Sequence, residues 1–322
     1  MSSRASNVLR FVFAVGLTAY LLYRSHPGQV GEALRGVSWP WIGAAVLLVF
    51  ADRALMAGRW IWLLGPVDRR HMPSTPTLLR IFFVSTFVGS FLPASVGSDA
   101  VRSWHAKERG VPGAQALASV LMDRVLGVAS ILIAATLGFV LNPGLLDQPY
   151  VRLAFVLSLG GCVVALFFVF SPHWDAFVRR RMLPRLPTRL QSIADRVLAA
   201  LQAYQSHHRT TFVVLAASVG VQILRIVQAW CLGVSLGMTT PLPAYFAFVP
   251  IILLVMLLPV TVSGLGVAQG AFRWLFVPSG ASEPVVFALS VLFLALGILG
   301  NLPGAFLFLV NRAEASRTSS LR

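Results

Sequence analysis

Two short polar stretches interrupt the apolar sequence, and both hold residues that could bind a charged group. The first runs from Phe91 to Arg102 and follows the apolar run Leu78–Leu92. The second runs from Leu258 to Gly266 and follows the apolar run Phe246–Leu257. Proline and small polar residues leave backbone groups that need partners, so lipid is an unfavourable environment for either stretch. A matched pair of interrupted segments predicts a transporter binding site between inverted repeats.

The side chains in and near these stretches favour binding of a lipid headgroup. Serine and threonine hydroxyls and irregular backbone would hold the headgroup, arginines would counter a phosphate, and Asp99 would orient an arginine or bind a cationic headgroup. Arg53 and Arg225 lie near the middle of predicted spans, where an arginine usually faces a polar cavity with a partner. The candidate substrate-binding residues are Arg53, Ser95, Ser98, Asp99, Arg102, Arg225, Thr261, Ser263, Gly264 and Gly266.

The elements that position these residues are predicted to be membrane-spanning helices. The 322 residues are 57% hydrophobic and only 11% charged, which indicates an all-α polytopic membrane protein. The net charge of +15 is more typical of cytoplasmic loops that face anionic lipid than of nucleic-acid binding. Two cysteines inside apolar runs and six scattered histidines form no metal-binding or redox spacing. We therefore expect no cofactor, no metal and no nucleic-acid partner.

Loop charge predicts the orientation of the spans. The apolar runs that could span are Val8–Tyr23, Trp39–Leu64, Gln115–Leu141, Val151–Phe170, Thr210–Leu236 and Pro284–Val310. Basic residues gather in loops 65–77, 98–114 and 171–209 and in the C-terminal tail, whereas loops 142–150 and 235–243 have none. The positive-inside rule places the basic set and both termini in the cytoplasm of a multi-pass protein in the cell (inner or plasma) membrane.

This orientation forces two segments to enter the membrane and return to the same side. Loops 65–77 and 98–114 both lie inside, so the segment between them is predicted to be a re-entrant hairpin; the segment after loop 235–243 is predicted to be a second one, entered from the opposite face. The expected organisation is an N-terminal repeat 1–141 with hairpin 78–101, an inverted repeat 142–310 with connector 171–209 and hairpin 244–277, and a cytoplasmic tail 311–322.

Other charged residues have simpler interpretations. Arg59 stands beside Trp60 and could extend toward the interface, and Asp123-Arg124 could be an interfacial pair. In the basic connector, apolar residues recur every three or four positions between Leu190 and Tyr204. This pattern predicts an amphipathic helix on the cytoplasmic leaflet with its arginines toward anionic headgroups, or simply a connector between the halves.

The motifs together resemble the membrane part of lysylphosphatidylglycerol synthases, a broad flippase-like family. The resemblance covers about residues 90–310 and rests on Leu92-Pro93, Gly97-Ser98-Asp99, Arg102, Ala116, Ser119-Val120, Asp123-Arg124, Pro259, Ser263-Gly264-Leu265-Gly266-Val267 and Gly280. It implies movement of a charged-headgroup lipid or a lipid-linked intermediate between leaflets, and some relatives are tied to polyprenyl-linked sugar pathways.

The sequence departs from the family pattern in three places. Gly97-Ser98-Asp99 stands where relatives have Gly-Gly-Asp or Gly-Glu, so the acid is kept. Ala268-Gln269 stands where relatives often have Arg-Glu, which removes a base and an acid from that position. The soluble aminoacyl-transferase domain of the full synthases is absent from the 322 residues, so we do not expect this chain to make lysyl-lipid itself.

Three functions agree with these observations. The first is a lipid flippase or transporter with no enzymatic activity, driven by a gradient or by lipid imbalance because the sequence has no nucleotide-binding P-loop. The second is a membrane glycosyl- or phospho-transferase that uses a polyprenyl-linked substrate, for which the candidate carboxylates are sparse. The third is a scaffold for another membrane enzyme. The sequence leaves the oligomeric state open.

Overall fold

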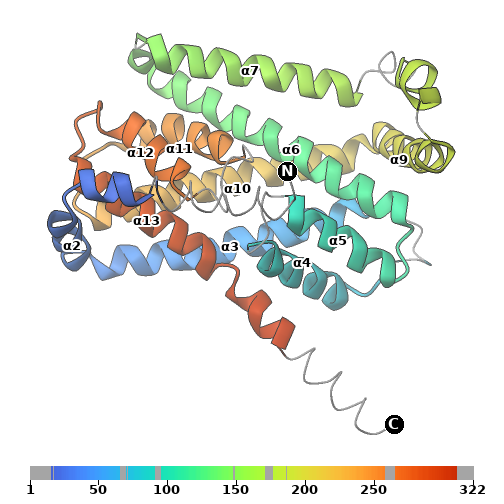
Figure 1. Ribbon diagram of the computed structural model, residues 1–322, viewed down its shortest axis with the longest axis horizontal. Coiled ribbons are helices and arrows are strands. Elements are labelled where there is room, and N and C mark those ends of the chain that lie inside the picture. The colour runs from blue at the N-terminus through green and yellow to red at the C-terminus, as the bar shows by residue number, and fades with distance from the viewer. Residues whose placement is uncertain are drawn as a thin grey trace, which may run out of the picture.

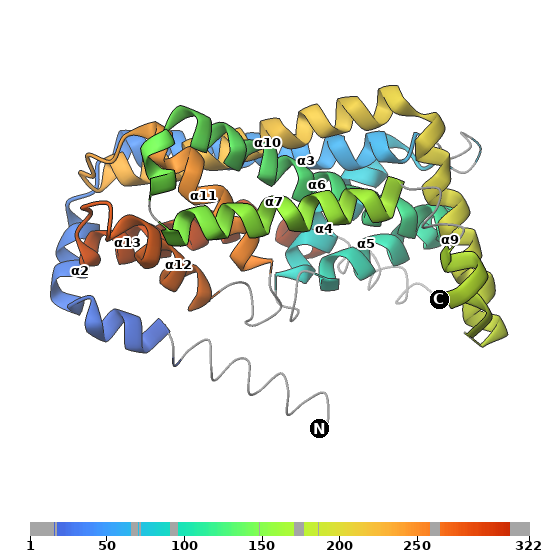
Figure 2. The same cartoon turned by 90° about the horizontal axis from the view of Figure 1, so that it is seen from above.

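The computed structural model describes residue 16 and residues 18–65, 70, 72–90, 96–147, 149–170, 177–185, 187–257 and 265–309. Within these ranges the regular elements are helices, and no β-strand is present. The long helices lie roughly side by side; some of the shorter helices lie among them, and others lie at the two ends of the molecule (Figures 1 and 2). The prediction of an all-α polytopic membrane protein is confirmed.

Four helices in the described part of the chain are long and apolar enough to cross a membrane. They are α3 (Trp39–Leu63), α6 (Gly113–Leu141), α10 (His208–Ser235) and α13 (Glu283–Leu299), the last with its helical continuation to Leu309. They match four of the predicted spans. α7 (Pro149–Phe170) covers a fifth. Most of the predicted first span, Val8–Tyr23, lies outside the described residues.

The remaining helices are shorter. Two pairs flank the polar stretches: α4 (Thr75–Gly89) with α5 (Val96–Glu108), and α11 (Leu242–Met256) with α12 (Val267–Phe276). The others are α2 (Pro27–Arg35), the 3-10 turns η2 (Pro143–Asp147) and η4 (Leu183–Arg185), the π-helical turn η3 (Val178–Met182) and α9 (Thr188–Ser206).

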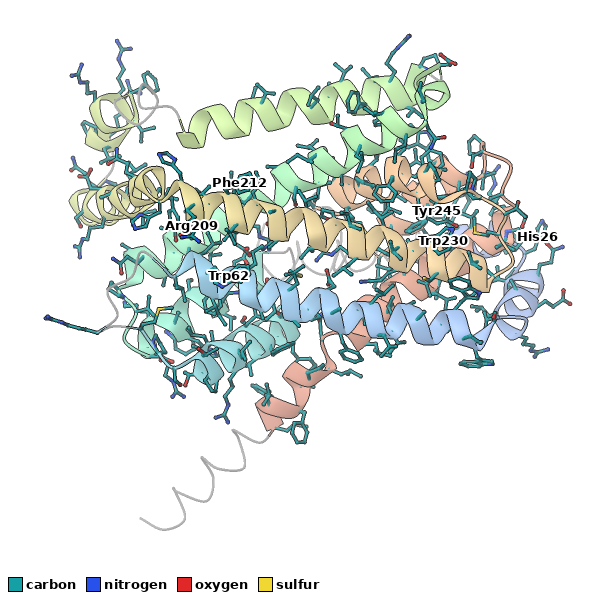
Figure 3. All side chains as sticks on the ribbon, turned by 180° about the vertical axis from the view of Figure 1, so that it is seen from behind. His26, Trp62, Arg209, Phe212, Trp230 and Tyr245 are labelled. Carbon is teal, nitrogen blue, oxygen red and sulfur yellow. The ribbon has the colours of Figure 1, made fainter. Side chains whose placement is uncertain are left out.

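Helices α3 and α10 pack against each other along their length and run in opposite directions (Figure 3). At one end, the N–H of Ser38 donates to the carbonyl of Ser235 over 2.9 Å, next to an edge-on contact between Trp41 and Trp230. At the other end, the hydroxyl of Tyr204 donates to the carbonyl of Leu63. The chain therefore leaves α3 and α10 at opposite ends of the molecule.

The two short helix pairs consequently start from opposite ends. α4 follows α3, α11 follows α10, and each has 15 residues. A helix of this length extends about 22 Å and cannot cross a hydrocarbon core of about 30 Å. That geometry is what the predicted hairpins require. Re-entrance into a bilayer and the inverted-repeat relation of the two halves stay predictions.

Glycines allow the closest approaches between the halves. Gly138 on α6 lies against the backbone of Phe246 and Ala247 on α11. Gly304, in the continuation of α13, lies in the same way against the carbonyl of Phe83 on α4. In both cases the span that follows one short pair packs on the first helix of the other pair. Small residues at such crossings let helix backbones approach closely within a membrane.

A methyl group at Gly138 is expected to destabilise the protein. In Gly138→Ala the new Cβ would collide with the backbone of α11, which has no side chain to rotate away. Overpacking of this kind costs about 1–3 kcal/mol, and thermal unfolding in detergent should show a lower midpoint. Gly160→Ala on α7, where a Cβ meets nothing within 4 Å, is the matched control. Equal midpoints for the two variants would contradict the α6–α11 contact.

The predicted amphipathic connector is helical as α9, but part of its apolar face contacts protein. Tyr204 is buried, and it packs with Ala200 and Leu201 against Leu63 and Met122 of α3 and α6. Its contact with a leaflet stays a prediction for the rest of the helix. The difference arises because periodicity shows that a face is apolar and not whether lipid or protein covers it.

Candidate functional site

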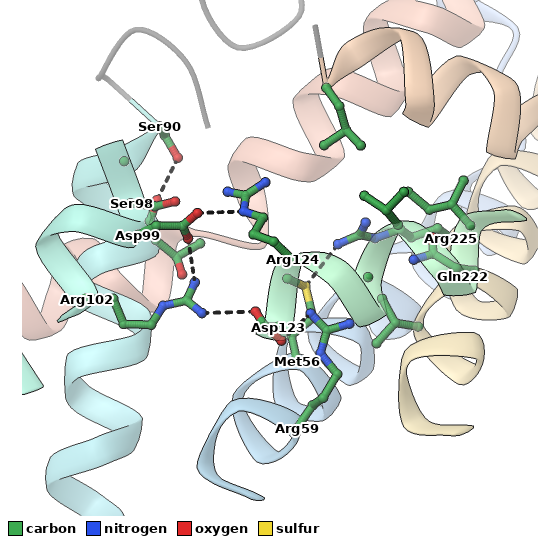
Figure 4. Close-up of a pocket in the computed structure, with 17 residues that line it drawn as sticks. Met56, Arg59, Ser90, Ser98, Asp99, Arg102, Asp123, Arg124, Gln222 and Arg225 are labelled. Carbon is green, nitrogen blue, oxygen red and sulfur yellow. Dashed lines mark hydrogen bonds and ion pairs between the residues drawn. The ribbon is translucent and has the colours of Figure 1, made fainter. Parts of the chain in front are cut away.

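A polar cavity of about 270 Å³ lies where helices from both halves of the chain meet (Figure 4). It is lined by α3, α4, α5, α6 and α10, and by Leu257 directly after α11. Ser90, at the end of α4, and Leu257 both line it. The helices that start from opposite ends of the molecule therefore finish at one cavity.

Asp123 on α6 joins two other helices through ion pairs. Its carboxylate lies 2.7 Å from Nη2 of Arg59 on α3 and 3.3 Å from Nη1 of Arg102 on α5. All three side chains are at least nine-tenths buried. Buried charges are tolerated when they are paired and hydrogen-bonded, and Nη1 of Arg59 also donates to the hydroxyl of Ser218 on α10 over 3.0 Å.

Arg102 is held from several sides. Besides Asp123, its guanidinium lies 3.9 Å from Asp99, one turn earlier on α5. It also stands 4.8 Å from the ring centre of Phe82 and 5.5 Å from that of Trp60, which are cation–π distances. These contacts fix the side chain, so Arg102 forms part of the cavity wall and extends little into the cavity.

Arg124 is the most exposed arginine of the cavity. Its Nε donates to Oδ2 of Asp99 over 2.6 Å, and 36% of its side chain is exposed. Asp99 lies in the first turn of α5, where the helix dipole favours a negative charge. The pair therefore connects the start of α5 to α6 while leaving part of the guanidinium open to the cavity.

Arg225 on α10 approaches from the other side (Figure 4). Its Nε donates to Asp52 over 3.1 Å, and its Nη2 lies 3.0 Å from the sulfur of Met56. Asp52 also pairs with Arg53 over 3.2 Å. Arg53 itself turns toward α13 and donates to the carbonyl of Gly297, so it lies beside the cavity and not on its wall.

One side of the cavity is apolar. Val128, Ile131, Val221 and Leu257 line it together with Met56. Gly127 adds room there, because a Cβ built on it would come no closer than 4.0 Å to Arg59. The cavity therefore joins a charged region to an apolar one, which is the division that the headgroup and chain of a lipid show.

Apart from Gly266, the predicted site residues divide into three groups. Ser98, Asp99, Arg102 and Arg225 line the cavity. Arg53 reaches it only indirectly, through Asp52, which also pairs with Arg225, and through the sulfur of Met56. The remaining predicted residues inside the polar stretches lie outside the described part of the chain: Ser95, Thr261, Ser263 and Gly264.

Gly266 has a local structural role. It precedes α12 with a φ of 79°, a left-handed conformation that favours glycine. Its N–H donates to Oε1 of Gln269 over 2.6 Å. Gln269, the residue expected to stand in place of the Glu of the family pattern, therefore caps the N-terminus of α12.

Three arginine and aspartate residues of the cavity were missed by sequence reasoning. An interfacial position was considered for Arg59, Asp123 and Arg124, and none of them was among the predicted binding residues, yet all three line the cavity. The spacing of Asp52, Met56 and Arg59 by four and three residues, which places them on one face of α3, was a usable signal. Among the described residues, no group of three or more His, Cys, Asp or Glu side chains could hold a metal ion.

The fold and the cavity define a polytopic helical membrane protein with a charged cavity between its helices. The chain belongs to the family described as the lysylphosphatidylglycerol synthase TM region, whose profile matches residues 7–304. It is 22% identical over 316 residues to a UPF0104 membrane protein of Methanothermobacter thermautotrophicus, and the matched region covers 90% of this chain and 88% of the relative. Family membership points to a lipid-related function in the membrane.

Proposed function

We propose that this protein is a lipid flippase or transporter that moves a charged-headgroup phospholipid or polyprenyl-linked lipid between membrane leaflets. The observation that carries the proposal is the cavity, because it places charged groups among helices that are otherwise apolar. Burying arginines and aspartates at membrane depth is costly, and such residues usually mark a substrate path. The nearby apolar wall suits the first part of a lipid chain.

The arrangement of the short helices supports alternating access. α4 and α11 start from opposite ends and finish at the cavity, so small movements of one half against the other would open it to either side. Ion pairs that link α3, α5, α6 and α10 through the cavity would have to rearrange as it opens. In this proposal the plasma membrane is the location, both termini are cytoplasmic, and anionic lipids contact the basic cytoplasmic face.

The alternative of a polyprenyl-dependent transferase finds less support. Such an enzyme needs a carboxylate that is free to act as a base or a metal ligand. Asp52, Asp99 and Asp123 are each contacted by two arginines. No contact in the described part of the chain specifically favours the transferase.

Filling the cavity is expected to stop translocation. Proteoliposomes would carry a headgroup-labelled lipid, and the fraction reached by an external quencher would be followed over time. The wild type should raise the translocation rate above that of protein-free vesicles. Gly127→Leu, which adds a side chain beside Arg59 on the cavity wall, should bring the rate back to that background.

The control is Gly160→Leu on α7, where an added Cβ meets nothing within 4 Å. This variant adds the same side chain away from the cavity and should keep the wild-type rate. Both variants would first be checked for a single symmetrical peak in size-exclusion chromatography. A well-folded Gly127→Leu protein that still translocates lipid would contradict the cavity as the path, and a wild type that moves no lipid would contradict the proposed function.

A further inference from the structure

The site has more positive than negative side chains. In and directly beside the cavity, the described residues comprise five arginines (53, 59, 102, 124 and 225) and three aspartates (52, 99 and 123). Arginine stays protonated at any ordinary pH, so the site has two more positive than negative charges. The polar stretches 91–95 and 258–264 contain no ionisable residue and cannot supply the missing negative charge.

The three carboxylates are already engaged by arginine. Asp52 is paired with Arg53 and Arg225, Asp123 with Arg59 and Arg102, and Asp99 with Arg124 over 2.6 Å and with Arg102 over 3.9 Å. A cationic headgroup would have to displace an arginine to reach any of them. An anionic headgroup can bind without displacing a carboxylate, because a guanidinium has several N–H donors and its aspartate partner uses only some of them.

Two guanidiniums are more accessible to a ligand than the others. Arg124 and Arg225 both line the cavity, and their side chains are 36% and 22% exposed, against 6% for Arg59 and 5% for Arg102.

We propose that the site binds the phosphate of a lipid phosphate monoester, whose headgroup has close to two negative charges at neutral pH. The two surplus positive charges match this headgroup better than they match a zwitterion or an aminoacylated, cationic lipid. Arg124 and Arg225 contact the phosphate oxygens from two sides, and the chain leaves along Val128, Ile131 and Leu257. The inference deepens the proposed function by naming its substrate class, and it rests on that function for transport but not for binding.

The test is direct binding to the purified full chain in a neutral detergent. Lipids of equal acyl length would be compared by titration: phosphatidic acid as the monoester, phosphatidylglycerol as the anionic diester, phosphatidylcholine as the zwitterion and lysylphosphatidylglycerol as the cation. A polyprenyl monophosphate and inorganic phosphate would complete the series. The monoesters should bind at least about 10-fold more tightly than the diester, since the second negative charge of the phosphate adds a charge-assisted hydrogen bond to an arginine.

Variants at Arg124 separate charge from fold. Arg124→Gln removes one of the two surplus charges and should abolish the preference for the monoester, whereas Arg124→Lys keeps the charge and should retain most of the preference. Arg196→Gln removes one positive charge from the exposed surface of α9 and should leave binding unchanged. If Arg124→Gln does not fold, Arg225→Gln removes the same charge from α10.

Each outcome decides the question. Equal or tighter binding of the cationic or zwitterionic lipid would overturn the inference, and so would an unchanged preference in folded Arg124→Gln and Arg225→Gln. Inorganic phosphate that binds as tightly as the lipid monoesters would overturn the lipid part. Translocation of another lipid without this preference would leave the proposed function standing and the inference refuted. Selective binding of the monoesters without any translocation would support the inference about binding and contradict the proposed transport function.

Discussion

Replacing Asp123 with alanine is expected to produce the largest loss of stability among the charged residues of the site. The substitution leaves Arg59 and Arg102 buried without the carboxylate that lies between them. Removing one partner of a buried ion pair typically costs about 3–5 kcal/mol, because the remaining charge is uncompensated. Here two like charges remain in one buried site, so the decrease in the free energy of unfolding should lie near the upper end of this range.

The measurement is equilibrium unfolding in mixed micelles, with the far-UV circular dichroism signal as a measure of helix content. Asp147→Ala in the exposed turn η2 deletes the same side chain and is the control, with an expected change within about 0.5 kcal/mol. Asp123→Asn keeps the shape and some hydrogen bonds and should fall between the two. An unfolding free energy for Asp123→Ala that equals that of Asp147→Ala would show that the carboxylate does not hold the three helices together.

A second-site change should recover part of this loss. In Asp123→Ala with Arg59→Met, one of the two uncompensated charges is gone while a long apolar side chain still fills α3. Buried ion pairs can often be replaced by packed apolar residues with little loss of stability. The double variant should therefore be more stable than Asp123→Ala alone, and a lower stability would contradict the electrostatic explanation.

Reversing the charge of Arg225 is expected to produce the largest loss of transport. In the wild type, Nε of Arg225 lies 3.1 Å from the carboxylate of Asp52. Arg225→Glu would therefore place a second carboxylate beside Asp52, and it would remove both surplus positive charges from the site. Loss of a buried charged contact costs about 2–5 kcal/mol, so the translocation rate should fall by roughly 30-fold or more.

Arg225→Met separates the two effects in Arg225→Glu. Methionine keeps much of the side-chain length beside Met56 and removes one charge without bringing two carboxylates together. Its translocation rate should fall less than that of Arg225→Glu, and its folding should be closer to wild type. The quenching assay in proteoliposomes measures both variants. Wild-type rates in Arg225→Glu would rule out a role of this arginine in transport.

Much of the fold follows from sequence properties that are local. Long apolar runs predicted α3, α6, α7, α10 and α13, because about 20 apolar residues suffice for a span whatever its neighbours are. The proline- and glycine-containing stretches marked where α4 and α11 end, and loop charge indicated that the two pairs start from opposite sides. The spans were therefore readable, whereas the short helix α2 was not predicted, because its nine residues are too few and too polar to stand out.

The site was only half readable from the sequence. Asp99 and Arg102 were recognised because a charge in a polar interruption is conspicuous in an apolar chain, and Arg225 was recognised for its depth in a predicted span. Arg59, Asp123 and Arg124 were not predicted to bind substrate, since a charge near the end of a span can reach water as easily as it can reach a partner. Arg53 was recognised for its depth, yet its guanidinium faces Gly297 and not the cavity.

Sequence alone therefore determined the class of protein, the position of most spans and the family to which it belongs, because each of these depends on composition and short-range pattern. Tertiary structure alone decided which charges share a site. The ion pair between Asp52 and Arg225 joins residues 173 positions apart, and that between Arg59 and Asp123 joins α3 to α6. Such pairs depend on which helices meet and where they cross, and the pattern within a single helix does not identify its neighbours.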